Sequence, residues 1–208
     1  MNKVIGLAIL AVVLVLAGAG AFMFSGIYDV GADTPHWALT TKAMEIVRDR
    51  AIAVRAKDIQ VPDLTGEQLI LKGAGQYAAM CVNCHLAPGK PDSEIRAGLY
   101  PKPPNLSEST FDPRTVFWVM KHGLKMSGMP AWGAGHDDET LWSIVAFVGK
   151  LPRMSAQQYQ DIVAKAPPDE EMESMEKAGG HNHAQGGGPD EPRSEPAKQT
   201  GPKSESLH

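Results

Sequence analysis

The sequence predicts an all-α protein that begins with a long apolar segment. In four stretches the apolar residues recur at intervals of three, four and seven, the spacing that places them on one face of an α-helix. Segments rich in glycine and proline interrupt these stretches, and a polar segment almost free of large apolar residues follows them. The predicted helices cover 35–57, 66–80, 111–124 and 139–150, with a shorter one at 155–165.

The first segment, from Val4 to Tyr28, is uncharged and mostly aliphatic. It exceeds the roughly 20 residues that span a hydrocarbon core, so it predicts a transmembrane helix. A cleaved signal peptide is the alternative, because Ala17-Gly18-Ala19 resembles a cleavage site. We favour the uncleaved anchor, since the apolar run continues beyond that site. In either case we expect the remainder on the outer, periplasmic side of a bacterial cytoplasmic membrane, with Lys3 on the inner side.

The helix predicted at 35–57 is amphipathic. Thr34 is a candidate cap and Pro35 a candidate first helical residue. One face carries the apolar residues Trp37, Met44, Val47, Ala51 and Val54. The other face has balanced basic and acidic residues, so we expect no nucleic-acid partner. The apolar stripe must be covered by the following domain, by the membrane surface or by a partner. His36 is an alternative metal ligand, although we favour an ordinary surface histidine.

Cys81-Val82-Asn83-Cys84-His85 is the most specific motif of the chain. Two thiols on one helical turn can reach the two vinyl groups of a porphyrin, and the adjacent histidine then faces the iron, so the motif predicts covalent attachment of haem c. A zinc site would need a second ligand pair, and the chain has only these two cysteines. A thioredoxin-like pair should follow a strand, whereas a predicted helix precedes this motif.

Several positions around the motif resemble class I cytochromes c. Gly73 and Tyr77 precede it as in the first helix of that family, and Pro103-Pro104-Asn105-Leu106 resembles the family's proline loop. Gly128-Met129-Pro130 resembles the loop that carries the family's methionine ligand, and the helix at 139–150 resembles the last helix, which crosses the first. The resemblance covers about 64–152.

The resemblance implies a role for each of these residues. The carbonyl of Pro104 accepts the hydrogen bond from His85 Nδ1, and His85 and Met129 are the two axial iron ligands. Met120, Met126 and His122 compete with Met129 for that role; for the two methionines we favour core packing, and for His122 a structural role. An apolar pocket around the haem is expected from Tyr77, Leu106, Phe117, Trp118, Trp132 and Trp142.

An iron with two protein ligands has no open site, so the expected function is single-electron transfer and not catalysis. The expected partners are membrane-bound or periplasmic redox proteins, reached by a mobile anchored carrier. A fixed haem subunit of a respiratory or dehydrogenase complex is the alternative, and a haem peroxidase or gas sensor using His122 or His136 is a remote one. Scattered lysines can steer a partner: Lys72, Lys90, Lys102, Lys121 and Lys125.

The expected organisation has five parts. These are an anchor or signal segment at 1–28, an amphipathic linker at 29–61, a haem domain at 62–152, a short helix at 153–166 and a disordered tail at 167–208. His181 and His183 of the tail are candidate weak metal ligands, which we expect to be incidental.

Overall fold

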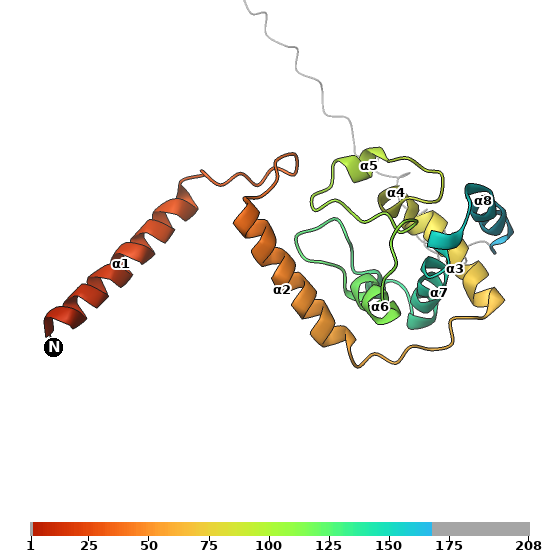
Figure 1. The fold of residues 1–208 in the computed structure, drawn as a ribbon, viewed down its shortest axis with the longest axis horizontal. Coiled ribbons are helices and arrows are strands. Elements are labelled where there is room, and N and C mark those ends of the chain that lie inside the picture. The colour runs from red at the N-terminus through yellow and green to blue at the C-terminus, as the bar shows by residue number, and fades with distance from the viewer. Residues whose placement is uncertain (1, 168–208) are drawn as a thin grey trace, which may run out of the picture. The chain divides into compact units, whose positions relative to one another are not determined.

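A computed structural model describes residues 2–167, and within that range every regular element is a helix. The all-α prediction is therefore confirmed for the described residues. The tail beyond residue 167, with His181 and His183, lies outside them. Figure 1 shows the α-helices α1 (Asn2–Phe24), α2 (Ala38–Ala56), α3 (Glu67–Met80), α4 (Val82–His85), α5 (Glu94–Ala97), α6 (Pro113–His122), α7 (Asp138–Val148) and α8 (Ala156–Lys165). Two short 3-10 turns are η1 (Trp132–Ala134) and η2 (Leu151–Arg153).

Helix α1 has 23 residues and is long and apolar enough to cross a membrane. None of its most apolar stretch is buried against other described residues. An amino-terminal signal sequence meets the same criteria, so α1 is either a membrane anchor or a signal sequence.

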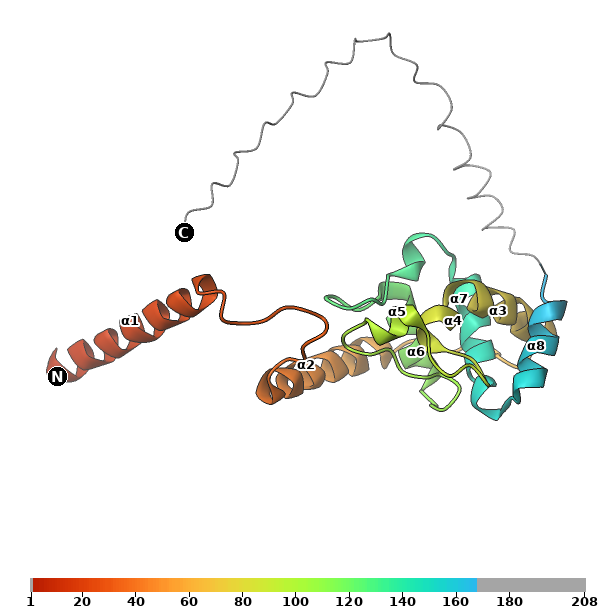
Figure 2. The same cartoon turned by 90° about the horizontal axis from the view of Figure 1, so that it is seen from above.

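The core of the haem-motif domain is the contact between α3 and α7 (Figure 2). A Cβ atom added to Gly73 would lie 2.0 Å from the backbone oxygen of Ser143 and 3.0 Å from Cβ of Phe147. Only a residue without a side chain allows this approach, as the sequence predicted. Tyr77 is fully buried one turn later, with its ring centroid 5.5 Å from that of Phe147.

Side-chain caps define where the later helices begin. The Asp112 carboxylate accepts a hydrogen bond from the Arg114 backbone N–H, and Pro113 occupies the first helical position of α6. Asp137, and not Asp138, caps α7 by accepting from Thr140 N–H at 2.8 Å. Ser155 begins α8 with a capping box. These short-range signals are why the sequence predicted these helices to within a few residues.

Helix α2 differs from its prediction in two respects. It begins at Ala38 and not at Pro35, because Tyr28 holds the preceding residues outside the helix: the Tyr28 hydroxyl bonds His36 Nδ1 at 2.8 Å, and the Tyr28 and Trp37 ring centroids are 5.1 Å apart. Its buried residues are Ile52 and Ala56, and α2 packs on α6. The predicted apolar stripe therefore does not face the domain.

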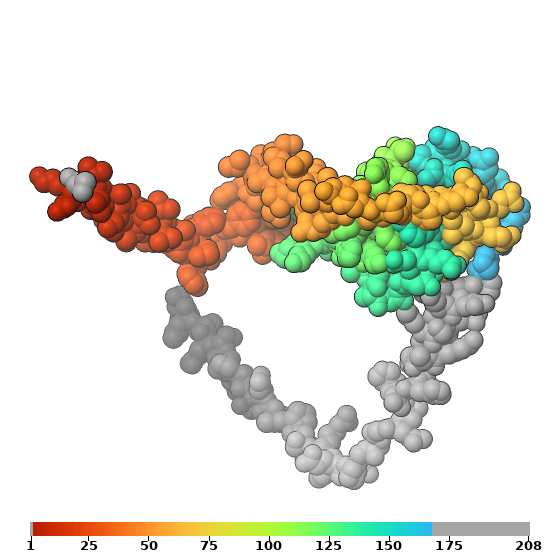
Figure 3. Space-filling view, turned by 90° about the horizontal axis from the view of Figure 1, so that it is seen from below, coloured from red at the N-terminus to blue at the C-terminus, as the bar shows by residue number. Residues whose placement is uncertain are grey.

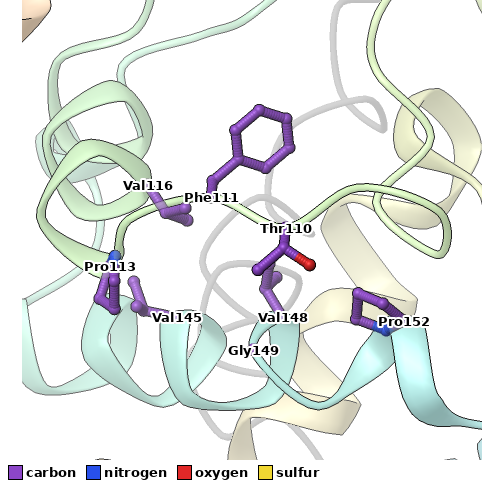
Figure 4. A pocket seen from close by; sticks show the side chains of 8 residues that line it. All are labelled: Thr110, Phe111, Pro113, Val116, Val145, Val148, Gly149 and Pro152. Atoms are coloured by element: carbon purple, nitrogen blue, oxygen red, sulfur yellow. The ribbon is translucent and has the colours of Figure 1, made fainter.

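A small cleft lies between the start of α6 and the end of α7 (Figure 4). Its volume is about 30 Å³, far below that of an organic ligand site. Its lining residues are Thr110, Phe111, Pro113, Val116, Val145, Val148, Gly149 and Pro152.

Candidate functional site

The two cysteines and the histidine lie on one helical turn that continues from α3. The backbone N–H of Cys81 donates to Tyr77 O at 2.9 Å, and the N–H groups of Cys84 and His85 both donate to Cys81 O. Both thiols are free. Burial, with a smaller contribution from the neighbouring Cys84, raises the pKa of the Cys81 thiol to about 12, so Cys81 is a neutral thiol near pH 7.

The chain leaves this turn through an unfavourable conformation at Leu86, which has φ of 63° and ψ of −175°. Residues other than glycine rarely adopt this region, and it costs on the order of 1–3 kcal/mol. Leu86 is held there because its side chain is buried and its carbonyl accepts the Tyr77 hydroxyl at 2.6 Å. The tyrosine thereby fixes the exit from the Cys-x-x-Cys-His turn.

The proline loop holds the His85 ring. His85 Nδ1 lies 3.0 Å from the Pro104 carbonyl oxygen, and the N–H of Leu106 donates to the His85 carbonyl at 3.1 Å. Because a carbonyl can only accept, Nδ1 carries the hydrogen and Nε2 keeps a free lone pair. Burial lowers the pKa of His85, although the bond to Pro104 opposes the change, so the imidazole is neutral near pH 7 and suited to bind a metal.

The proline loop is itself supported by charged residues that the sequence did not indicate. Arg96 Nε donates to the Pro103 carbonyl at 3.1 Å, one residue before the carbonyl that binds His85. Asp92 binds both Arg96 Nη1 at 3.1 Å and Lys102 Nζ at 3.0 Å. Arg96 belongs to α5, a four-residue helix too short to show a period in the sequence.

Met129 lies on a loop closed by its own hydrogen bonds. The N–H of Leu124 donates to the Met129 carbonyl at 3.1 Å. Ser127 Oγ donates to Leu124 O at 2.8 Å and accepts from the Met129 N–H at 3.2 Å. A Cβ atom at Gly123, which has φ of +65°, would lie 2.7 Å from the Pro130 carbonyl carbon. The end of α6 therefore packs directly on the backbone of this loop.

The hydrophobic core unites the attachment turn with the methionine loop. Cys81 and Tyr77 are buried members of this core, and Leu106, Met129 and Trp132 pack against it. Hydrogen bonds link Cys84 and His85 to Cys81 and Tyr77, and His85 to Pro104. Core contacts and these hydrogen bonds therefore connect the predicted site residues: Tyr77, Cys81, Cys84, His85, Pro104, Met129 and Trp132.

The competing residues have other surroundings. Met120 is buried in the core, as predicted. Met126 was predicted in the core but is 92% exposed at the tip of the loop, where its φ of 59° turns it outward. His122 is an exposed last residue of α6 beside the ring of Trp118, and His136 Nδ1 bonds the Trp132 carbonyl at 3.2 Å.

These residues fit haem c. Two free thiols and a neutral imidazole share one turn, the imidazole has Nε2 available, and a thioether packs on the same core as Cys81. This is the set of groups that covalent attachment and two axial ligands require.

Residues 68–148 match the family model described as cytochrome C oxidase, cbb3-type, subunit III. No curated protein and no solved structure matches the chain. The matched residues run through α3 to the end of α7 and contain the whole candidate site. They form a class I c-type cytochrome domain, whose general function is electron transfer by a covalently bound haem. Helices α1, α2 and α8 lie outside the match.

Proposed function

We propose that this protein is a membrane-anchored monohaem cytochrome c that transfers single electrons on the periplasmic side of a bacterial cytoplasmic membrane. Cys81 and Cys84 attach the haem, and His85 and Met129 are its axial ligands. The observation that carries the proposal is the bond from His85 Nδ1 to Pro104 O at 3.0 Å beside the Cys-x-x-Cys turn, since it prepares Nε2 to bind the iron.

The haem, when bound, supplies an iron that alternates between the ferrous and ferric states. His85 and Met129 would each provide one ligand to that iron. Pro104 orients His85, and the bonds of Ser127 hold the Met129 loop in one conformation. A thioether ligand favours ferrous iron, and the apolar core residues around Cys81 act in the same direction. With both residues bound, the iron would have no position open to a substrate, and the domain would exchange electrons alone.

The family description favours a second candidate, in which the chain is a fixed haem subunit of a redox complex. In that case the electron partner is a neighbouring subunit and not a diffusing protein. Extraction of native membranes in mild detergent distinguishes the two: a stable complex with a catalytic subunit supports the fixed subunit, and a chain recovered alone supports the carrier.

The proposed function is tested on the haem-loaded full chain. A redox titration followed by absorbance should fit a one-electron Nernst curve for a single haem, and carbon monoxide should leave the spectrum of the reduced protein unchanged. A rapid spectral change with carbon monoxide would show an open axial position and would support an enzyme or gas sensor instead.

A further inference from the structure

Helix α2 has two different faces. Ile52 and Ala56 are buried, and through this inner face α2 packs on α6. The residues predicted as one apolar stripe lie on other sides of the helix: at about 100° per residue, Val47 and Val54 are roughly opposite the inner face, and Met44 and Ala51 lie between the two. Trp37 is the residue immediately before α2. We call this set the outer stripe: Trp37, Met44, Val47, Ala51 and Val54.

The outer stripe is apolar and mostly exposed, with Ala51 half-buried. Trp37 is 57% exposed and Val47 is 62% exposed, and Met44 and Val54 are exposed to a similar degree. Leu39 and Ile46 widen this apolar surface and are exposed as well. Figure 3 shows a face of α2, in orange, that no other coloured segment covers. Surface apolar residues that form one continuous face, and are not scattered singly, mark an interaction site.

Basic residues border this surface. By the helical period, Arg48 and Arg55 follow one edge of it, Lys42 follows the other, and Arg50 lies within it between Val47 and Ile46. Two acidic residues accompany them: Glu45 lies toward the inner face and pairs with Lys42 at 3.5 Å, and Asp49 lies beside Lys42 and pairs with Arg48 at 2.8 Å. Long basic side chains beside an apolar stripe suit a membrane surface, since they can extend to phosphate groups while the stripe enters the acyl boundary.

Direct contacts connect the start of α2 to the end of α1. The ring centroid of Phe22, in the last turns of α1, lies 6.0 Å from that of Trp37 and 6.3 Å from that of Tyr28. Aromatic residues are enriched where a spanning helix leaves the hydrocarbon core. The outer stripe therefore starts at the level where α1 would leave the membrane.

The same segment also contacts the haem domain. The His36 ring centroid lies 5.1 Å from that of Tyr100, and Thr41 Oγ1 lies 3.3 Å from the Tyr100 hydroxyl. Leu99, next to Tyr100, lies beside Gly128 in the loop of Met129. Helix α2 is thus attached to the haem domain at both its ends, through Tyr100 near its start and through Ile52 and Ala56 near its end.

We propose that the outer stripe of α2 lies in the headgroup region of the bilayer that α1 spans, so that α2 holds the haem domain against the membrane surface in one orientation. This inference rests on the membrane anchor in the proposed function. The occupant is lipid because the stripe begins beside the spanning helix and is bordered by basic residues. An orientation fixed by α2 restricts the haem to electron partners in the same membrane.

The test uses spin labels on the haem-loaded full chain in vesicles of phosphatidylethanolamine and phosphatidylglycerol. Val47→Cys carries a label on the outer stripe, and Asp49→Cys is the matched control two residues along the same helix. Both side chains are exposed, so both variants should fold and keep the haem spectrum. Power saturation then measures contact of each label with oxygen, which concentrates in lipid, and with a water-soluble nickel chelate.

We expect the Val47→Cys label to contact oxygen at least several-fold more, relative to nickel, than the Asp49→Cys label. Equal contact of both labels with nickel, in a chain that stays in the vesicles, overturns this proposal and leaves the anchor and the electron-transfer function standing. Spin–spin broadening between Val47→Cys labels at low protein-to-lipid ratio would show a second copy of the chain on the stripe and also overturns it. If the cell removes α1 from the native protein and the rest of the chain is recovered in the aqueous fraction, the anchor and this proposal are overturned together. The haem spectrum of that protein reports separately on electron transfer.

Discussion

Gly73 of α3 meets the backbone of Ser143 of α7 so closely that a Cβ atom at Gly73 would lie 2.0 Å from the Ser143 oxygen. Because that neighbour is backbone, Gly73→Ala must push the two helices apart. We expect a loss of about 3 kcal/mol or more in the free energy of unfolding. Chemical denaturation of the haem-loaded protein measures it. Gly98→Ala is the control, since an added Cβ there stays at least 3.8 Å from its neighbours, and a loss as large in the control would refute the steric explanation.

Tyr77→Phe should destabilise the exit from the Cys-x-x-Cys-His turn. The variant removes the hydroxyl that donates to Leu86 O at 2.6 Å and leaves that carbonyl buried without its partner. We expect a loss of about 1–3 kcal/mol in the free energy of unfolding. Tyr159→Phe is the matched control on α8, where the tyrosine is only half-buried, and we expect less than about 1 kcal/mol there. Equal losses in the two variants would contradict the account of Leu86.

Ser127→Ala should loosen the Met129 loop without unfolding the helices. It removes the bond to Leu124 O and the acceptor of the Met129 N–H. On heating, we expect the methionine-to-iron charge-transfer band to disappear at a lower temperature than in the native protein, while the far-ultraviolet circular dichroism transition moves little. Ser127→Thr keeps the hydroxyl and should restore the native band. If the band and the helices are lost together in Ser127→Ala, the serine stabilises the whole domain and not the loop.

Asp92→Asn should destabilise the proline loop in a manner that depends on pH. The N–H of Ser93 and the bonds from Lys102 and Arg96 lower the pKa of Asp92 to about 2, below its ordinary value of roughly 3.9. A lowered pKa means that the carboxylate stabilises the fold above pH 4 and loses this effect as pH falls toward 2. The thermal midpoint of Asp92→Asn should therefore lie slightly below that of the native protein at pH 7, and the two should converge between pH 4 and 2. A difference that stays constant over that range would exclude the ionic contribution.

Short-range sequence signals predicted much of the fold and most of the site. Cys81, Cys84 and His85 lie within five consecutive residues, so their spacing alone places them on one turn. Gly73 and Tyr77 precede them by fixed helical intervals, and the caps Asp112, Asp137 and Ser155 act within three residues. Each of these features depends on neighbours in the sequence, which is why the sequence pattern was sufficient to predict it.

The features that the sequence did not reveal depend on contacts between distant segments. Arg96 supports the proline loop through a bond to Pro103, and Leu99 packs on Gly128 across the domain. The apolar period predicted the stripe on α2 but not the direction in which it faces. The contact with α6 is made instead by another face of the helix, which carries Ile52 and Ala56. A period shows that residues share a face; the tertiary structure decides what covers it.

The central claim is that Met129 is the sixth ligand of the haem iron. An optical redox titration of the native protein, Met129→Ala and Met126→Ala tests it, following the long-wavelength methionine-to-iron charge-transfer band. Met126 is a matched control, because it is a methionine three residues away that is 92% exposed. We expect Met129→Ala to lose the band and to lower the reduction potential, with Met126→Ala unchanged in both. A band that persists in Met129→Ala, or is absent from the native protein, would contradict His85 and Met129 ligation.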